Sequence, residues 1–386
     1  MISRMRNVLG LAKPTTPAAL RFNRPLVLFQ SDDWGRVGVR DREGWEELRA
    51  AGLNLGEKPY DFYTLETAED VHALGEVLRK HRDSAGRRPS MVMNFIMANV
   101  DFDGCFEPGQ KRIPLRPLTE GLPGKWRRPQ LLEAYRQGIR ERLFYPALHG
   151  LTHFCERAIA RELDTGEERS ELVKKLWRAQ TPYIHWRMPW IGYEYWDPEL
   201  RPAHRFLPVD DQRAAIKRAA GIFRDLFTTS PFSACAPGYR ANADSRTAWF
   251  EDGVRVVQNG AQNGPGERTG PYLDENGMLS TYRTVEIEPA MERCDVEKLV
   301  TQVEECFAGG LPAVISIHSI NFHSTIQDFR TPTLKLLDEF LTALEKKWPS
   351  LLYVHDADLF LIATEGAYAG ENGRVSVGVT SAGASR

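Results

Sequence analysis

Short apolar segments alternate with amphipathic segments along most of this 386-residue chain, and this alternation constrains its fold more than any other feature. The apolar segments have the length of buried strands and lie at residues 25–30, 91–97, 144–148, 232–236, 254–258, 283–287, 312–317 and 351–354. Helices are predicted at residues 43–51, 68–81, 129–142, 211–227, 296–308 and 333–347. Strands that alternate with helices indicate a parallel sheet or a (β/α) barrel, and therefore an α/β fold.

Acidic or histidine side chains stand directly after three of the predicted strands. Asp32 and Asp33 follow the first strand, His149 follows the third, and His318 follows the most apolar one. In parallel α/β folds, catalytic groups lie at the carboxyl ends of the strands. We therefore expect these four side chains to converge on one rim of the sheet.

The charge balance argues against a protein whose main role is to bind nucleic acid. Lysine and arginine (50) nearly equal aspartate and glutamate (52), whereas such proteins usually carry a clear basic excess. A local basic stretch at residues 125–128 is expected to be a solvated loop. No apolar stretch approaches the length of a membrane span, and residues 8–12 are too short for the core of a signal peptide. The sequence therefore favours a cytoplasmic protein without a membrane span.

The length allows one large domain or two ordinary ones, and the pattern favours one. Residues 1–24 are interpreted as an N-terminal arm, residues 25–365 as the α/β domain, and residues 366–386, rich in Gly, Ser and Ala, as a disordered tail. An aromatic-rich insertion is expected at about residues 155–230. The five cysteines have no Cys-x-x-Cys spacing, which argues against a disulfide framework and a structural zinc knuckle.

Each candidate group also has a purely structural interpretation. Acidic residues after a strand often cap a helix or shape a turn, and this alone would explain Asp32 and Asp33. His149 and His153, four residues apart, would share one face of a helical turn and could bind a metal ion, although a surface or capping pair fits the same spacing. His318 could be a hydrogen-bonded histidine at a strand end. The metal-site hypothesis rests on their occurrence together.

These motifs resemble those of the polysaccharide deacetylases of the NodB-homology, carbohydrate-esterase type. The Asp32-Asp33 pair is similar to that family's paired aspartates, and residues 149–153 (HGLTH) are similar to its His-x-x-x-His motif. Residues 236–240 (APGYR) resemble its Arg/Pro/Tyr loop, and residues 315–318 (ISIH) resemble its Leu-x-x-His strand. The similarity covers about residues 25–360 in the family's order, and it implies a distorted (β/α) barrel.

The resemblance also implies roles in catalysis. Asp33, His149 and His153 would bind one divalent metal ion, usually zinc or another first-row metal, which suits a set of one carboxylate and two imidazoles. Asp32 would be the general base that takes a proton from water. His318 would be the general acid that protonates the departing amine.

Further residues are assigned to the substrate or the oxyanion. The backbone N–H of Tyr239 would help to hold the oxyanion, with Pro237 and Arg240 in the same motif. Arg240 follows the tyrosine here, whereas the family's arginine usually precedes the proline. Trp34 occupies the place of a family glycine beside the aspartates. His323 is predicted to contact the substrate or other site groups, and it is the alternative candidate for the acid.

Two parts of the site depart from the family pattern. No clean Asp-x-x-Asp-Trp motif is present to orient His318, and Glu286 or Glu288 is expected to replace it. The insertion places several aromatic residues near Arg187, and such rings can stack on sugars while arginine holds an anionic group. We favour the alternative, a small core that fixes the insertion to the barrel. The aromatic residues are Tyr183, Trp186, Trp190, Tyr193, Tyr195 and Trp196.

The motifs together predict a metal-dependent hydrolase that removes an N-acetyl group from a sugar of a glycan or glycan precursor. An amide requires an activated water, an electrophilic cation and an acid for the departing nitrogen, and all three are predicted here. Hydrolysis of another amide, such as a cyclic ureide, is one alternative. A catalytically dead glycan-binding protein on the same scaffold is another, although the retention of both aspartates argues against it.

Overall fold

The strands of the main sheet follow one another in sequence order around the molecule. The computed structural model describes residues 18–105, 113–185, 187–260 and 270–381, and eight parallel strands pair in it in the order β11-β12-β2-β3-β6-β7-β8-β10. Their bounds are β2 (Leu26–Trp34), β3 (Met91–Ile96), β6 (Phe144–Gly150), β7 (Ser233–Cys235), β8 (Val256–Asn259), β10 (Leu279–Tyr282), β11 (Val285–Glu286) and β12 (Ala313–His318). Among these residues β10 does not pair with β11, so the barrel is open there. The predicted α/β class and distorted (β/α) barrel are confirmed.

Two further strands extend this sheet. β13 (Leu352–Tyr353) runs parallel to the beginning of β2, and β9 (Tyr272–Leu273) is antiparallel to β10. Neither β9 nor β10 is predicted from the sequence, because the first is only two residues long and the second, LSTY, is half polar. A separate two-stranded sheet joins β4 (Ala98–Val100) to β5 (Leu115–Pro117).

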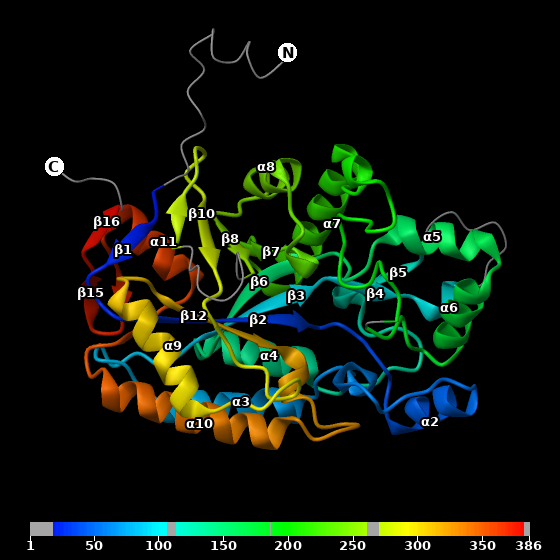
Figure 1. Cartoon of the computed structure of the whole chain (residues 1–386), viewed down its shortest axis with the longest axis horizontal. Coiled ribbons are helices and arrows are strands. Elements are labelled where there is room, and N and C mark those ends of the chain that lie inside the picture. The colour runs from blue at the N-terminus through cyan, green and yellow to red at the C-terminus, as the bar shows by residue number, and fades with distance from the viewer. Residues whose placement is uncertain (1–17, 106–112, 186, 261–269, 382–386) are drawn as a thin grey trace, which may run out of the picture.

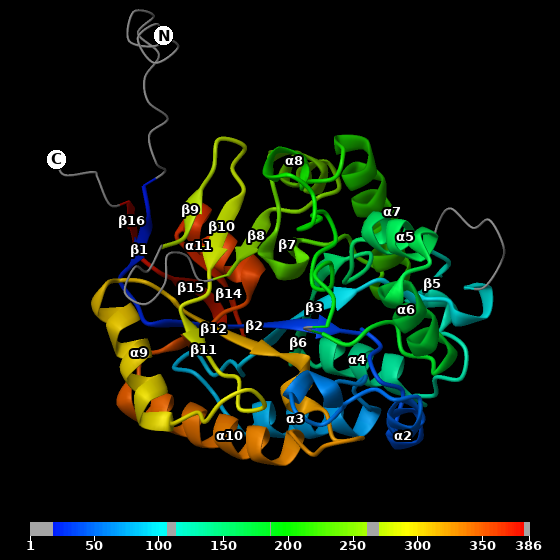
Figure 2. The same ribbon diagram turned by 45° about the vertical axis from the view of Figure 1, so that its right-hand side comes forward.

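Helices cover the outside of the sheet. In Figures 1 and 2, α9, α10, α3 and α4 lie side by side along one flank, and α7 packs on α8 further round the barrel. The bounds are α2 (Arg42–Ala50), α3 (Ala68–Lys80), α4 (Leu131–Arg140), α5 (Glu156–Thr165), α6 (Glu168–Arg178), α7 (Val209–Phe227), α8 (Ala243–Glu251), α9 (Val296–Ala308), α10 (Arg330–Lys347) and α11 (Asp356–Glu365). No described helix is long and apolar enough to cross a membrane.

The insertion belongs to the same hydrophobic core as the strands. Every residue of β2 is buried, as expected for a central parallel strand covered on both faces. Tyr183, Trp190 and Tyr195 of the insertion are also buried and join this core. Their burial supports the packing interpretation. Tyr193 and Trp196 are only half-buried, and Trp186 lies outside the described residues.

The chain ends contain strands that composition does not reveal. β14 (Ala367–Gly370) pairs with β15 (Gly373–Ser376), and β16 (Val379–Ser381) pairs antiparallel with β1 (Leu20–Phe22). The prediction of a disordered tail is therefore wrong for this part of the chain. Tyr368 and Val377 are 2% exposed, and these two apolar anchors outweigh the surrounding Gly and Ser. Residues 1–17 and 382–386 of the predicted arm and tail lie outside the described residues.

Candidate metal and catalytic site

A distortion of β2 turns both aspartates to the same rim. Neighbouring side chains of a regular strand point to opposite faces. Here the pairing of β2 with β3 shifts register between Ser31 and Trp34, and Asp33 has a φ of 76°, in the left-handed region. Such a conformation costs a non-glycine residue about 1–3 kcal/mol, and strain of this kind clusters at functional sites. As a result Asp32 and Asp33 line one cavity.

Three side chains meet with the geometry of a metal site. Oδ1 of Asp33 lies 3.0 Å from Nε2 of His153 and 3.5 Å from Nε2 of His149. Donor atoms about 2.1 Å from a tetrahedral zinc ion lie about 3.4 Å apart, so the spacing fits such an ion. Buried Oδ1 has no other hydrogen-bond partner among the described residues. Nδ1 of His149 donates to the Cys235 carbonyl (2.9 Å), which leaves Nε2 free to bind a metal.

The two histidines do not meet on a helix. β6 ends at Gly150, and α5 begins only at Glu156, so the HGLTH motif turns through irregular backbone between them. The prediction that His149 and His153 share a helical face is wrong. Gly150 has a φ of 140°, which a residue with a side chain rarely adopts, and this turn brings the two rings to a centroid distance of 5.2 Å.

A buried arginine that the sequence does not reveal contacts two of the three proposed ligands. Nη1 of Arg36 lies 3.1 Å from Oδ2 of Asp33 and 2.9 Å from Nδ1 of His153, and its guanidinium packs over Tyr63. Burial and then Arg36 lower the pKa of His153 to about 4, so the ring is neutral. Because arginine only donates, Nδ1 must accept, and the proton of the neutral ring resides on Nε2.

The side chains present fit a divalent ion in type and spacing, but Arg36 must adjust. Ligation through Nε2 would place the proton of His153 on Nδ1, where it would face the N–H of Arg36. The guanidinium would then have to leave His153 and keep only its contact with Asp33. Arg36 is therefore a built-in competitor of the metal ion.

Asp32 is ionised and lies beside the three proposed metal ligands. Its Oδ1 accepts hydrogen bonds from Arg283 (2.6 Å) and Asn94 (2.7 Å), and its Oδ2 accepts one from the Tyr239 hydroxyl (3.2 Å). Burial opposes ionisation, but Arg283 and the nearby histidines outweigh it and hold the pKa of Asp32 well below its usual value. Arg283 directly follows β10, and no recognisable motif marks it in the sequence.

His318, at the end of β12, has the partner expected of a proton donor. Its Nδ1 lies 2.6 Å from Oε1 of Glu288, which also accepts the His318 backbone N–H. Its Nε2 lies 3.8 Å from Oδ2 of Asp32. Burial lowers the pKa of His318, but Glu288 outweighs burial and raises it to about 9. Of the two acidic residues expected to orient His318, Glu288 makes the contact.

These groups line one cavity of about 880 Å³ at the carboxyl ends of the strands. The insertion forms one wall, and the segment after β11 forms another. Tyr60 and His185 also line the cavity, although no sequence motif predicts them there, and their rings stack at a centroid distance of 4.5 Å. The lining residues are Asp32, Asp33, Tyr60, His149, His153, His185, Arg187, Met188, Pro189, Ile191, Gly192, Tyr193, Gly238, Tyr239, Glu286, Glu288, Met291, Glu292 and His318.

Two residues predicted to contact the substrate do not line this cavity. Trp34 is fully buried, donates from Nε1 to Ser31 (2.8 Å) and stacks on Phe322. His323 is 1% exposed, with Nε2 3.3 Å from Oε2 of Glu66. The substrate role is corrected for both residues: Trp34 packs in the core, and His323 packs against Tyr63, whose hydroxyl donates to the Asp33 carbonyl.

The APGYR segment contributes differently from the prediction. The backbone N–H of Tyr239 donates to the Ala236 carbonyl (2.8 Å), so it is free for an oxyanion only if that bond opens. Pro237 is buried and does not line the cavity, whereas the Tyr239 ring does. Arg240 is exposed and lies over the ring of Trp196 outside the lining residues. The arginine beside Asp32 is instead Arg283, which directly follows β10.

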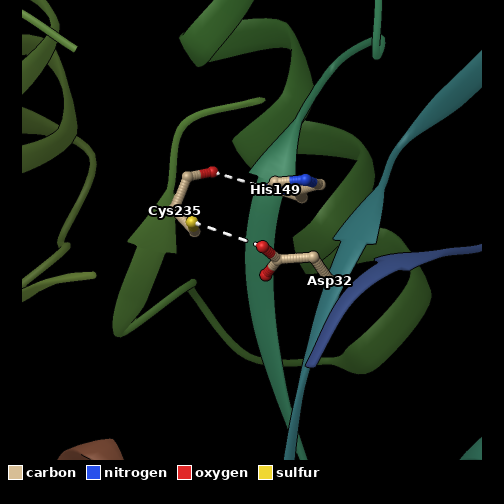
Figure 3. A group of neighbouring side chains, drawn as sticks. All are labelled: Asp32, His149 and Cys235. Carbon is tan, nitrogen blue, oxygen red and sulfur yellow. Dashed lines mark hydrogen bonds between the residues drawn. The ribbon is translucent and has the colours of Figure 1, made fainter. Parts of the chain in front are cut away.

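A second group of possible ligands shares His149. Figure 3 shows Asp32, His149 and Cys235, which come from β2, β6 and β7 and point toward one another. The Cys235 thiol lies 4.0 Å from Oδ2 of Asp32. Burial, reinforced by Asp32, raises the pKa of the thiol well above its ordinary value, so it remains protonated near neutral pH. Zinc binding here would have to displace this proton and compete with Arg283 for Asp32, so the group with Asp33 and His153 is the better candidate.

No family model and no curated protein matches this sequence. Some solved structures are similar to this one at low sequence identity. A candidate polysaccharide deacetylase from Mycobacterium smegmatis is 10% identical, with a TM-score of 0.46, over 92% of this chain and 93% of that one. A family 4 carbohydrate esterase pseudoenzyme from Bacillus anthracis is 11% identical, with a TM-score of 0.41, over 89% and 69%. An allantoinase is 10% identical, with a TM-score of 0.45, over 89% and 92%. These similarities assign no activity to this chain.

Proposed function

We propose that this chain is a metal-dependent hydrolase that removes the N-acetyl group from a sugar of a glycan or glycan precursor. One observation carries the proposal. Asp33, His149 and His153 converge in a cavity that Asp32 and His318 also line. This arrangement offers three metal ligands, a separate carboxylate and a separate acid, as amide hydrolysis requires.

The base is proposed to be Asp32. A divalent ion held by the three ligands would polarise an amide carbonyl and lower the pKa of a bound water. Arg283 keeps Asp32 ionised and binds its Oδ1. The other oxygen, Oδ2, faces Tyr239 and His318, which line the cavity. A low pKa makes Asp32 a weak base, and it therefore depends on an acidified water.

The acid is proposed to be His318. Glu288 keeps its imidazole protonated at neutral pH, and Nε2 is the nitrogen left to donate, because Nδ1 is bound to the carboxylate. An amide nitrogen leaves only when it is protonated, whereas an alcohol leaves from an ester with less help. The pairing of His318 with Glu288 therefore supports an amide as the substrate.

One observation favours a second candidate, a glycan-binding protein that holds no metal. Arg36 already neutralises Asp33 and contacts His153 (2.9 Å), so the triad is compensated without an added cation. In that case the cavity would bind sugar without hydrolysing it. The strained backbone of Asp33 weighs toward catalysis, because packing alone gives no reason to retain it.

Metal content and acetate release test the proposal together. We expect the protein, after loading with Zn²⁺ and dialysis, to hold one ion per chain and to release acetate from N-acetylhexosamine oligomers or a glycolipid precursor. His318→Ala should impair amide hydrolysis far more than hydrolysis of an activated acetyl ester. Turnover of a cyclic amide without any acetate release would replace the sugar substrate with a cyclic ureide. Sugar binding by a protein that retains no metal would favour the binding-protein candidate.

A further inference from the structure

The insertion is bonded to the chain on both sides of His153. The backbone N–H of Gly192 donates to the carbonyl of His153 (3.1 Å), and the N–H of Cys155 donates to the carbonyl of Trp190 (3.3 Å). Between these bonds, Phe154 and Ile191 form an antiparallel bridge. The segment that carries one proposed metal ligand thus depends on a part of the chain about forty residues away for its backbone partners.

One side chain of the insertion also binds the backbone of the turn between His149 and His153. Glu194 is 5% exposed, and its Oε1 accepts the backbone N–H groups of Leu151 (3.0 Å) and Thr152 (3.2 Å). Both donors lie in the irregular turn between His149 and His153, where no helix or strand supplies an acceptor. A buried N–H without an acceptor costs about 1–3 kcal/mol, so Glu194 fixes the shape of this turn.

The turn and the carboxyl group of Glu194 fit closely. A Cβ atom at Gly150 would lie 2.3 Å from Oε2 of Glu194, a distance that non-bonded atoms do not reach. Glycine at this position therefore allows both the positive φ of the turn and the approach of the carboxyl group.

We propose that Glu194 is a positioning residue for the metal site: by accepting the N–H groups of Leu151 and Thr152, it sets the distance and angle between His149 and His153. The inference rests on the metal site of the proposed function and goes beyond it, because it assigns the insertion a role in metal affinity. Among the described residues, Glu194 forms no hydrogen bond or ion pair with the side chains of the three proposed ligands, so its effect would be carried by the backbone. Groups that orient metal ligands typically contribute about 10–100-fold to metal affinity.

Two substitutions separate positioning from simple stabilisation. Glu194→Gln retains an amide oxygen that can accept both N–H groups, whereas Glu194→Leu is of similar size and accepts neither. A purely structural role would lower the melting temperature of the leucine variant and leave its metal affinity unchanged. Leu344→Ala is the matched control, because Leu344 is buried on α10, outside the cavity lining, and its truncation destabilises the fold without altering the turn.

The measurement is titration of the full chain with Zn²⁺ by calorimetry, together with Co²⁺ absorption spectra, below the melting temperature of every variant. We expect Glu194→Gln to bind within about threefold of the unsubstituted protein, and Glu194→Leu to bind about 10–100-fold more weakly with an altered Co²⁺ spectrum.

Should the leucine variant not fold, Glu194→Asp, which is one methylene too short to span both donors, should show the same loss to a smaller degree. Unchanged affinity and spectrum in Glu194→Leu, or in Glu194→Asp where the leucine variant does not fold, would overturn the inference, and so would an equal loss in Leu344→Ala. Absence of metal binding in the unsubstituted protein would instead overturn the proposed metal site and, with it, this role.

Discussion

The barrel strands and the insertion contribute to the site in different ways. The strands supply most of the proposed reactive side chains, since Asp32, Asp33, His149 and His318 all lie in the last residues of β2, β6 and β12. The insertion supplies a cavity wall and the backbone partners of the turn that ends in His153. Under the proposed function, the acid and base would therefore be held by the sheet, and the metal geometry would depend on a later part of the chain. Substitutions in the two regions should therefore change different quantities.

The largest effect, a loss of kcat, is expected from a substitution in a strand. Asp32→Asn should lower kcat by about 10²–10⁴-fold, because the amide cannot take the proton from water. Metal affinity should change little, since Asp32 is not among the three proposed ligands, whereas the melting temperature should fall, because Arg283 is left buried without its carboxylate partner. Steady-state kinetics and zinc titration of the same preparation measure both. Loss of metal from this variant would mean that Asp32 and Asp33 have exchanged roles.

A substitution in the insertion should mainly change the free energy of unfolding. Trp190 is fully buried, so Trp190→Ala should lower the free energy of unfolding by about 3–5 kcal/mol. Denaturant unfolding checks this value, with Trp196→Ala as the control, because Trp196 is only half-buried and should cost much less. A Trp190→Ala protein of unchanged stability that no longer binds substrate would show that the aromatic residues serve recognition and not packing.

A third substitution tests the competition at the metal triad. Removal of the guanidinium in Arg36→Met should raise zinc affinity by about tenfold or more, because the ion no longer shares Asp33 with a positive charge. The same change should destabilise the metal-free protein, which is left with a buried uncompensated carboxylate. Arg36→Lys keeps the charge and is the matched control in calorimetric titration. Weaker zinc binding in Arg36→Met than in Arg36→Lys would make Arg36 a support of the site.

The smallest effect at neutral pH is expected from Glu288→Gln. Glu288 raises the pKa of His318 to about 9, and a general acid acts only in its protonated form, so activity should persist below pH 9 and fall as the pH rises through that value. Without the carboxylate the pKa drops, and the alkaline fall should begin at a lower pH. The pH dependence of kcat for the two proteins measures this difference. Coincident alkaline limbs would remove His318 from the acid role.

Sequence patterns predict the strand-borne part of the molecule better than the rest. Apolar runs of strand length give the sheet, and the helix predicted at residues 296–308 coincides with α9. Asp32, Asp33, His149 and His318 are predictable because they stand at the ends of such runs. The strands near the two chain ends are not predicted, because a few buried apolar residues stabilise them although the average composition of these segments is polar and glycine-rich.

The partners of the reactive groups could not be predicted, because they depend on contacts across the fold. Arg283 reaches Asp32 across 251 residues of sequence, and Glu194 reaches Leu151 across 43. Arg36 is close to Asp33 in sequence but resembles any other arginine in a loop. A signal exists only for Glu288, which stands just beyond a predicted strand and makes the expected contact with His318.

The thiol of Cys235 gives the site a vulnerability to thiophilic ions. Its position beside Asp32 and His149 adds a soft ligand to a site otherwise made of oxygen and nitrogen, and thiolate ligands favour soft ions such as Cu⁺. Because His149 belongs to both groups, an ion held by sulfur would deprive the proposed catalytic ion of a ligand. We expect micromolar copper under reducing conditions to inhibit acetate release by the protein, and the Cys235→Ser variant to resist this inhibition.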